Sequence, residues 1–387
     1  MIQVTTILVC RQASKYGRAM TSITALPTSI EGLTPAWLTS TLRAAGTIDG
    51  DTEVTAVRRE QIAEGVGFTS YLFRLHLELT GEGPSTLVVK LPTDTAHLQV
   101  AQITGAYERE VAFYRHVASE SPLETPRTHF AAVAPGTTDF VLVIDDLGEL
   151  ECADHLAGLS LERAERVIDE LARFHAWGWG LSPTGAQHPA FVAIDSPVTI
   201  GLFTFGIAAG WETYRRHGRA EAPAGLADVI ENFAELLPAM VASVAEPVTL
   251  INGDLRADNL FFGPDETPTT VDFQLVMRGA GIWDVAYLVG QGLTPQERGD
   301  NTHRLVERYV DGLRAAGIDY PLERAWEQFC TAALAQITYP LTAMMGWDAL
   351  NERAKELLRT LTERAFSIIE DTDALNSWHS RGGNYAN

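Results

Sequence analysis

The chain reads Asn252-Gly253-Asp254-Leu255-Arg256-Ala257-Asp258-Asn259 and then, after Leu260-Phe261-Phe262 and a Gly-Pro turn, Val271-Asp272-Phe273-Gln274. The apolar residues on either side of the turn predict a short hairpin between the two polar stretches. Because the two ends of a hairpin lie together, we expect Asn259 and Asp272 to face the same point. An amide oxygen and a carboxylate are hard ligands of the kind that Mg²⁺ prefers.

The spacing of these residues indicates phosphoryl transfer. Asp254 and Asn259 have the D-L-x-x-x-N spacing of a kinase catalytic loop. In that chemistry an Asp accepts the proton of the substrate hydroxyl, while an Asn and a second Asp hold Mg²⁺. We therefore predict Asp254 as the catalytic base and Asn259 and Asp272 as the metal ligands. In isolation the same cluster also fits an ordinary turn, so the prediction depends on what precedes it.

A small glycine-rich segment lies upstream, Glu64-Gly65-Val66-Gly67-Phe68-Thr69-Ser70. Residues without bulky side chains let backbone N–H groups approach a phosphate closely. We predict Gly65 and Gly67 as nucleotide-binding residues. The alternative is a plain turn, because Ser70 stands where the third glycine of a kinase loop would be.

Lys90 and Glu110 form the next predicted pair. Lys90 ends the run Val88-Val89-Lys90, like the strand whose Lys holds nucleotide phosphates in kinases. Glu110 lies in the middle of an apolar helix face that comprises Ile103, Ala106, Tyr107, Tyr114 and Val117. A buried carboxylate is costly unless a cation meets it, and Lys90 is the obvious partner. The alternatives are a solvated Lys90 and a Glu110 that lies at a rim or pairs with Arg109 or another Arg.

Hydrophobic periodicity predicts an α+β protein. Alternation along Tyr71–Leu79, followed by short apolar runs at Leu87–Leu91 and Phe140–Ile144, indicates strands in the first part of the chain. After a Ser160 cap the apolar spacing changes to three and four, and this helical pattern recurs from 302 to 370. We predict a loose tail over 1–20, a β-rich N-lobe over 21–146 and a helical C-lobe over 147–387. Met20 remains an alternative start.

Composition narrows the class of protein. The 387 residues carry 29 Lys and Arg against 50 Asp and Glu, a net charge of −21, which argues against nucleic-acid binding. The three cysteines are far apart and form neither a disulfide framework nor a CxxC metal pattern. The N-terminus has the wrong order of charge and hydrophobicity for a signal peptide, and no apolar stretch is long enough to span a membrane. We therefore expect a cytoplasmic protein with no membrane partner.

Taken together, the sequence resembles the aminoglycoside phosphotransferase and choline kinase group of the protein-kinase-like fold, and most closely its ecdysteroid-kinase-like branch. The likeness runs from about residue 54 to 290 and is carried by the Gly65 loop, Val88–Lys90, Arg109–Tyr114, Ala172–Ala176, Asn252–Asn259, Asp272–Gln274 and Trp283–Tyr287. It implies a bilobal kinase with ATP between the lobes and the adenine held by backbone groups after Ile144. It further implies that Lys90 holds the α- and β-phosphates, Glu110 positions Lys90, and Asp284 braces the catalytic loop.

Two positions depart from known kinase patterns. The family usually has His where Asn252 stands, and Gln274 replaces the glycine of a protein kinase's Asp-Phe-Gly. An Asn side chain both donates and accepts hydrogen bonds, so we expect the geometry to survive. The Asp-Phe-Gln form is itself familiar in the ecdysteroid-kinase-like branch.

The acceptor is expected to be a small molecule. Only eleven residues separate Asp272 from Asp284, too few for the segment that protein kinases use to dock peptides. Aromatic and Met residues in the helical part would suit an apolar alcohol, although simple core packing is the commoner role of such residues; they are Trp211, Tyr214, Phe233, Tyr339, Met344, Met345 and Trp347. An acidic pocket for a cationic aminoglycoside or amine is the competing interpretation. We assign His175 to packing at a helix end.

The sequence thus predicts an ATP- and Mg²⁺-dependent kinase that phosphorylates a hydroxyl of a small aminoglycoside-, choline- or sterol-like acceptor. The alternative is an ATP-binding pseudokinase with a regulatory or scaffold role. The acceptor, the physiological role and the oligomeric state are left open by the sequence.

Overall fold

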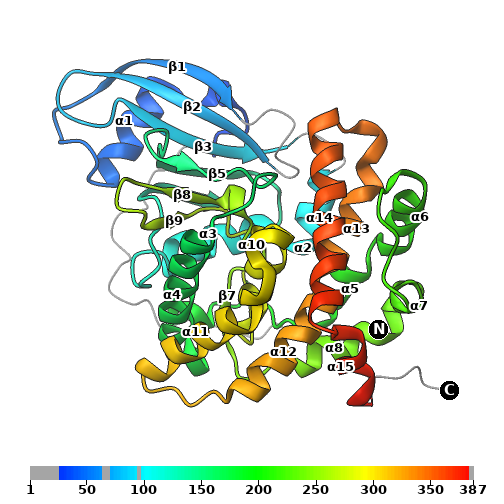
Figure 1. The fold of residues 1–387 in the computed structure, drawn as a ribbon. Helices are drawn as coiled ribbons and strands as arrows, with labels where there is room; N and C mark the ends of the chain where they lie inside the picture. The colour runs from blue at the N-terminus through cyan, green and yellow to red at the C-terminus, as the bar shows by residue number, and fades with distance from the viewer. Residues whose placement is uncertain (1–25, 63–69, 94–96, 383–387) are drawn as a thin grey trace, which may run out of the picture.

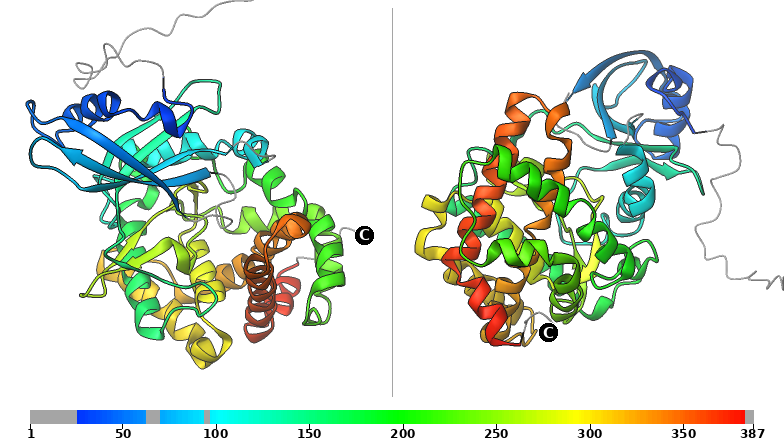
Figure 2. Two further views of the ribbon diagram at one scale, coloured as in Figure 1. Left: turned by 90° about the horizontal axis from the view of Figure 1, so that it is seen from above. Right: turned by 90° about the vertical axis from the view of Figure 1, so that its right-hand side faces the viewer.

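The computed structural model describes residues 26–62, 70–93 and 97–382. The glycine-rich segment with Gly65 and Gly67, and the N-terminal tail expected over 1–20, lie outside the described residues. Figure 1 shows a β-sheet at one end of the molecule and a larger group of helices at the other. The views in Figure 2 show the same division from two further sides. The architecture is α+β as predicted, with a β-rich N-terminal part and a mainly helical C-terminal part.

The N-terminal sheet is antiparallel, with the strand order β1-β2-β3-β5-β4. Its strands are β1 (Val54–Ile62), β2 (Ser70–Leu79), β3 (Thr86–Pro92), β4 (Thr128–Val133) and β5 (Phe140–Asp145). The strand predicted from period-two alternation is β2, and β3 pairs with it in the antiparallel hairpin that the intervening turn predicts. The expected strand at Phe140–Ile144 is β5.

Helices cover both faces of this sheet. Helix α1 (Pro35–Ala44) packs on one face around Leu38, Leu42 and Leu75. Helix α3 (Ala106–His116) packs on the other face, where Tyr107 stacks on Phe140 with ring centroids 4.6 Å apart.

The helix predicted to carry Glu110 is interrupted at its start. Ile103 belongs to a separate helix, α2 (His97–Thr104), rather than to the face that carries Glu110. The break lies at Gly105, whose φ of 65° is a left-handed conformation that glycine adopts without strain.

The C-terminal part is mainly helical. Its helices are α4 (Leu161–Trp177), α5 (Pro197–Thr204), α6 (Ile207–His217), α7 (Leu226–Glu231), α8 (Phe233–Ser243), α9 (Ile282–Tyr287), α10 (Pro295–Arg298), α11 (Thr302–Ala315), α12 (Leu322–Ala335), α13 (Thr338–Ala343), α14 (Glu352–Asp371) and α15 (Ala374–Ser380). Helix α4 begins as predicted, because the Ser160 side chain accepts a hydrogen bond from the backbone of Arg163. Among the helices that the structure describes, none is both long and apolar enough to cross a membrane.

Short strands frame the polar segments around Asp254 and Asp272. They are β6 (Glu151–Cys152), β7 (Thr249–Ile251), β8 (Leu260–Phe262), β9 (Pro268–Thr270) and β10 (Met277–Gly279). Strands β8 and β9 form the predicted hairpin, with Leu260 opposite Thr270. Strands β7 and β10 pair antiparallel, so the segments that follow β7 and precede β10 lie together.

Candidate active site

Lys90 and Glu110 form a buried ion pair beneath the sheet. Lys90 lies on the inner strand β3, and its Nζ donates to Glu110 Oε1 at 2.6 Å. The same Nζ lies 3.6 Å from Asp272 Oδ1. Glu110 has no exposed surface and Lys90 is 6% exposed. The alternatives of a solvated Lys90 and of a Glu110–Arg109 pair are therefore wrong.

The protonation of this pair follows from its neighbours. Burial alone lowers the pKa of Lys90, but Asp272 and Glu110 outweigh that effect and raise the pKa above its ordinary value. Lys90 is therefore a fixed cation. Burial raises the pKa of Glu110, and the Lys90 charge opposes the rise.

Gln274 completes the surroundings of Glu110. Its Nε2 donates to Glu110 Oε2 at 3.1 Å and to the Ser70 hydroxyl at 3.0 Å. The two carboxylate oxygens of Glu110 thus have different partners, Lys90 on one side and Gln274 on the other. A glycine at position 274 would leave the second oxygen without this donor. The departure from Asp-Phe-Gly therefore has a structural role that the sequence did not reveal.

Asn259 and Asp272 lie at the joined ends of the β8–β9 hairpin. The Val271 N–H donates to the Asn259 carbonyl at 3.0 Å, which holds Asn259 beside the residue that precedes Asp272. The Asn259 Nδ2 donates to the Asp254 carbonyl at 2.9 Å, so its amide oxygen is left for another ligand. Asp272 has a φ of 65°, a left-handed conformation that is costly for a residue other than glycine and is typical of functional sites.

Asn259 and Asp272 suit Mg²⁺, which needs few protein ligands, better than a metal ion whose ligands all come from the protein. Within the described residues there is no cluster of three or more His, Cys, Asp or Glu arranged to hold a metal ion. Mg²⁺ commonly takes one or two protein oxygens and fills its remaining positions with waters and substrate phosphates. The Asp272 carboxylate, with 32% of the side chain exposed, and the Asn259 amide oxygen are such a set.

Asp254 occupies the loop after β7. Burial raises the pKa of its carboxyl to about 7, against the opposing effect of Arg256. The Arg256 Nε lies 3.3 Å from Asp254 Oδ1, and the Tyr287 hydroxyl is hydrogen-bonded to the same carboxyl. A base with a pKa near the working pH is the kind that general base catalysis favours. Gly253 permits the loop's course, because at φ +83° a Cβ would lie 2.4 Å from the Leu275 carbonyl oxygen.

Asn252 and Asp284 fix the catalytic loop. Asn252 Oδ1 accepts from the Asp254 N–H at 2.9 Å, while its Nδ2 donates to the Asp272 carbonyl at 3.2 Å. The expectation that Asn252 would both donate and accept is confirmed. Asp284 accepts from the backbone N–H groups of Asn252 at 2.7 Å and of Gly253 at 2.9 Å. It therefore braces the loop as expected.

His175 does more than pack at a helix end. Its Nε2 lies 3.3 Å from Asp284 Oδ2, and its Nδ1 lies 2.9 Å from the Tyr309 hydroxyl. The side chain is completely buried. The assignment of His175 to packing at a helix end is correct but incomplete, because the residue also links helix α4 to the carboxylate that braces the catalytic loop.

Aromatic side chains border the catalytic loop on the C-terminal side. The Tyr339 hydroxyl donates to the Gly253 carbonyl at 2.6 Å, and the Tyr339 ring lies 4.9 Å from that of Tyr287 and 5.4 Å from that of Phe203. Of the seven aromatic and Met residues considered as an acceptor pocket, five are buried core: Trp211, Tyr214, Phe233, Met344 and Trp347. Tyr339 is half-buried and Met345 is exposed. Core packing thus explains most of that set.

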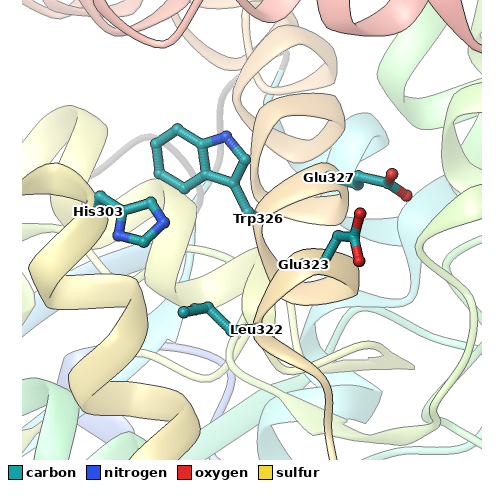
Figure 3. A pocket seen from close by; sticks show the side chains of 5 residues that line it. All are labelled: His303, Leu322, Glu323, Trp326 and Glu327. Carbon is teal, nitrogen blue, oxygen red and sulfur yellow. The ribbon is translucent and has the colours of Figure 1, made fainter.

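A separate hollow of about 470 Å³ lies between α11 and α12. Figure 3 shows the Trp326 ring turned toward His303, while Glu323 and Glu327 point to the other side. The residues that line the hollow include none of those at the catalytic loop.

Several contacts of the site had no local signal in the sequence. Tyr287, Tyr339 and His175 reach the catalytic loop from helices far apart in the chain, so no local spacing marks them. Arg256 lies inside the catalytic motif, but the motif itself assigns it no role. Only its position two residues after Asp254 hinted at its contact.

Known structures share this architecture. A choline kinase from Cryptosporidium parvum Iowa II superposes with a TM-score of 0.54 at 10% identity, over 88% of this chain and 95% of its own. A choline/ethanolamine kinase family protein from Mesorhizobium loti gives 0.44 at 15% identity, over 87% and 93%. The GDP complex of wild-type aminoglycoside 2'-phosphotransferase-IIIa gives 0.47 at 14% identity, over 87% and 98%. No curated protein sequence matches the chain.

The choline kinase likeness shows the fold alone. The family comes from the sequence itself, because the profile of the ecdysteroid kinase-like family matches residues 64–319, well over half of the chain. The chain therefore belongs to the ecdysteroid kinase-like family.

Proposed function

We propose that this protein is an ATP- and Mg²⁺-dependent kinase that transfers the γ-phosphoryl group to a hydroxyl of a small molecule. One observation carries the proposal: Lys90 Nζ lies 2.6 Å from Glu110 and 3.6 Å from Asp272. Three residues that are distant in the sequence thus meet where a phosphate-binding cation and a metal-binding carboxylate are both needed.

Each residue has a definite task in this proposal. Lys90 binds the α- and β-phosphates, and Glu110 orients the Lys90 side chain. Asn259 and Asp272 hold Mg²⁺, which when bound neutralises phosphate charge. Asp254 accepts the proton of the acceptor hydroxyl and orients its oxygen for in-line attack. Catalysis of this kind consists mainly of positioning and charge neutralisation.

The short segment between Asp272 and the next strand and helix favours a small acceptor. Strand β10 begins at Met277 and helix α9 at Ile282, so little chain remains to dock a peptide. The half-buried Tyr339 and the exposed Phe205 and Met345 provide apolar surface on the helical side. The acceptor is accordingly proposed to be a hydroxylated small molecule rather than a protein.

A pseudokinase is the weaker candidate. Lys90, Asp254, Asn259 and Asp272 are all present, and a degenerate nucleotide-binding module would be expected to have lost at least one of them.

The test is release of ADP from Mg-ATP by the purified protein in the presence of single hydroxylated compounds. The panel contains aminoglycosides, choline-like amines, sterols and hydroxy acids. Acceptor-dependent ADP release that disappears in Asp254→Ala supports the kinase. If no acceptor gives turnover and Mg-ATP produces no thermal stabilisation, the proposed nucleotide site is wrong.

A further inference from the structure

Arg109 is a buried cation for which the proposed phosphoryl transfer has no use. It precedes Glu110 on helix α3 and takes no part in the Lys90–Glu110 pair. The side chain is only 2% exposed. Among the residues that the structure describes, no group accepts a hydrogen bond from its Nε or Nη2.

The other cations of the site have carboxylate partners. Lys90 pairs with Glu110, and Arg256 lies within 3.6 Å of both Asp254 and Asp258. Within the described part of the chain Arg109 has no ion pair. Glu108, the acidic neighbour on the same helix whose charge acts on Arg109, is exposed to solvent. A buried charge without a partner is costly, so a guanidinium in this state is suited to bind an anion.

Arg109 lies near Tyr339, a residue that contacts the loop of Asp254. Burial lowers the pKa of its guanidinium to about 10, and the Tyr339 hydroxyl opposes that effect, which places the two groups near one another. Tyr339 donates to the Gly253 carbonyl at 2.6 Å, one residue before Asp254. Because Tyr339 is half-buried, its surroundings can be reached from outside. Arg109 therefore lies near a residue that contacts the loop of Asp254, and it takes no part in the Lys90–Glu110 pair.

We infer that Arg109 binds an anionic group of the acceptor, a carboxylate or a phosphate, while the acceptor hydroxyl lies at Asp254. This inference rests on the proposed function and narrows its acceptor to a hydroxylated anion. The planar guanidinium fork matches either oxyanion with two parallel hydrogen bonds. Hydrogen bonds to such a group would satisfy Arg109 Nε and Nη2, which have no acceptor among the described residues.

The test uses pairs of related hydroxylated probes, of which one member is an anion and the other is neutral. The first pair is 4-hydroxybutyrate and its methyl ester, the second 12-hydroxydodecanoate and its methyl ester, and the third sn-glycerol 3-phosphate and glycerol. Binding is measured by calorimetry in the presence of Mg²⁺ and a non-hydrolysable ATP analogue, and ADP release is measured separately with Mg-ATP. The variants are Arg109→Met, Arg109→Lys and, as a control on the same helix, the exposed Arg115→Met.

We expect wild-type protein to bind at least one anion tenfold or more tightly than its neutral partner. Arg109→Met should abolish that preference and leave Mg-ATP affinity unchanged, Arg109→Lys should retain part of it, and Arg115→Met should match wild type. A preference within the hydroxybutyrate or hydroxydodecanoate pair would indicate a carboxylate site. A preference for glycerol 3-phosphate over glycerol would indicate a phosphate site. If Arg109→Met does not fold, the wild-type preference and its reduction in Arg109→Lys still decide the matter.

The inference is overturned if wild type shows no anion preference, if the preference survives in Arg109→Met, or if that variant loses Mg-ATP binding instead. ADP release driven by neutral or cationic alcohols alone keeps the kinase and removes the anion site. Anion binding through Arg109 without any ADP release keeps the anion site and removes the kinase.

Discussion

Burial raises the pKa of the Asp254 carboxyl to about 7, so the charged and neutral forms coexist at neutral pH. The folded chain holds this proton more tightly than the unfolded chain, whose Asp titrates near its ordinary value. Stability from this group is therefore fully present below about pH 4 and is lost as the pH rises through about 7. The charge that the proposed base needs for chemistry thus costs folding free energy.

Asp254→Asn should relieve this cost. In the absence of nucleotide and Mg²⁺, the variant should gain stability over wild type, and the gain should be larger at pH 8 than at pH 5, reaching at most about 4 kcal/mol. Urea denaturation at the two pH values measures it. The exposed Asp228→Asn on α7 is the control and should show no such trend. A gain that is equal at both pH values would contradict a pKa of about 7.

Gln274 offers a second test at the residue scale. Gln274→Leu removes the donor to the buried Glu110 carboxylate, so we expect a loss of about 1.5–3 kcal/mol in the free energy of unfolding. Mg-ATP affinity should also fall, because Glu110 then holds Lys90 less firmly. Gln274→Glu should be worse, since it brings a second carboxylate against the first. Denaturation and calorimetry check both effects, with the exposed Gln102→Leu as control; an unchanged Mg-ATP affinity would limit Gln274 to stability.

Among the elements, α4, α9 and the catalytic loop meet at one buried point. His175 from α4 reaches Asp284 on α9, and Asp284 holds the backbone of Asn252 and Gly253. Gly281, just before α9, allows this approach: a Cβ there would lie 2.3 Å from the Tyr309 hydroxyl and 2.4 Å from His175 Nδ1. Both neighbours are fully buried and cannot move aside cheaply.

Gly281→Ala should therefore push α4 and α9 apart. We expect it to destabilise the fold by about 1–3 kcal/mol and to lower kcat while Mg-ATP affinity stays near wild type. Gly201→Ala is the matched control, because Gly201 lies in α5, where a Cβ would meet no described atom within 4 Å. Thermal unfolding and steady-state kinetics decide: if the two variants behave alike, the His175–Asp284 contact does not depend on this close approach.

How far the sequence predicts these elements depends on how local their signals are. The β2 strand, the β2–β3 hairpin and the Ser160 cap of α4 were predictable, because each rests on neighbouring residues. The pairing of Lys90 with Glu110 was also predictable, since a carboxylate on an apolar helix face demands a cation. The break at Gly105 was missed, because the apolar spacing continues across it.

Contacts between residues that are far apart in the chain could not be predicted from local sequence patterns. No spacing connects His175 to Asp284 or Tyr339 to Gly253, so the sequence could not show that they meet. The partnerless state of Arg109 among the described residues is likewise a property of the packed chain, visible only once its neighbours are placed.

For the whole molecule, the proposed site joins the sheet to the helices. Lys90 belongs to the sheet and Asp272 to the segment before β10, so a ligand held by both ties the two parts together. Mg-ATP at a hundredfold excess over its Kd should stabilise the protein by about 2.7 kcal/mol. Thermal shift measures this stabilisation, and removal of Mg²⁺ with EDTA should largely abolish it. Equal stabilisation with and without the metal would exclude Asn259 and Asp272 as its ligands.

The central claim is that one site binds Mg-ATP through Asp272 and activates the acceptor hydroxyl through Asp254. The measurement is a calorimetric Mg-ATP titration of wild type, Asp254→Ala and Asp272→Ala, with acceptor-dependent ADP release recorded on the same samples. The account predicts that Asp254→Ala binds Mg-ATP like wild type but releases no ADP, whereas Asp272→Ala loses the binding itself. Normal turnover by Asp254→Ala, or undiminished Mg-ATP binding by Asp272→Ala, would contradict it.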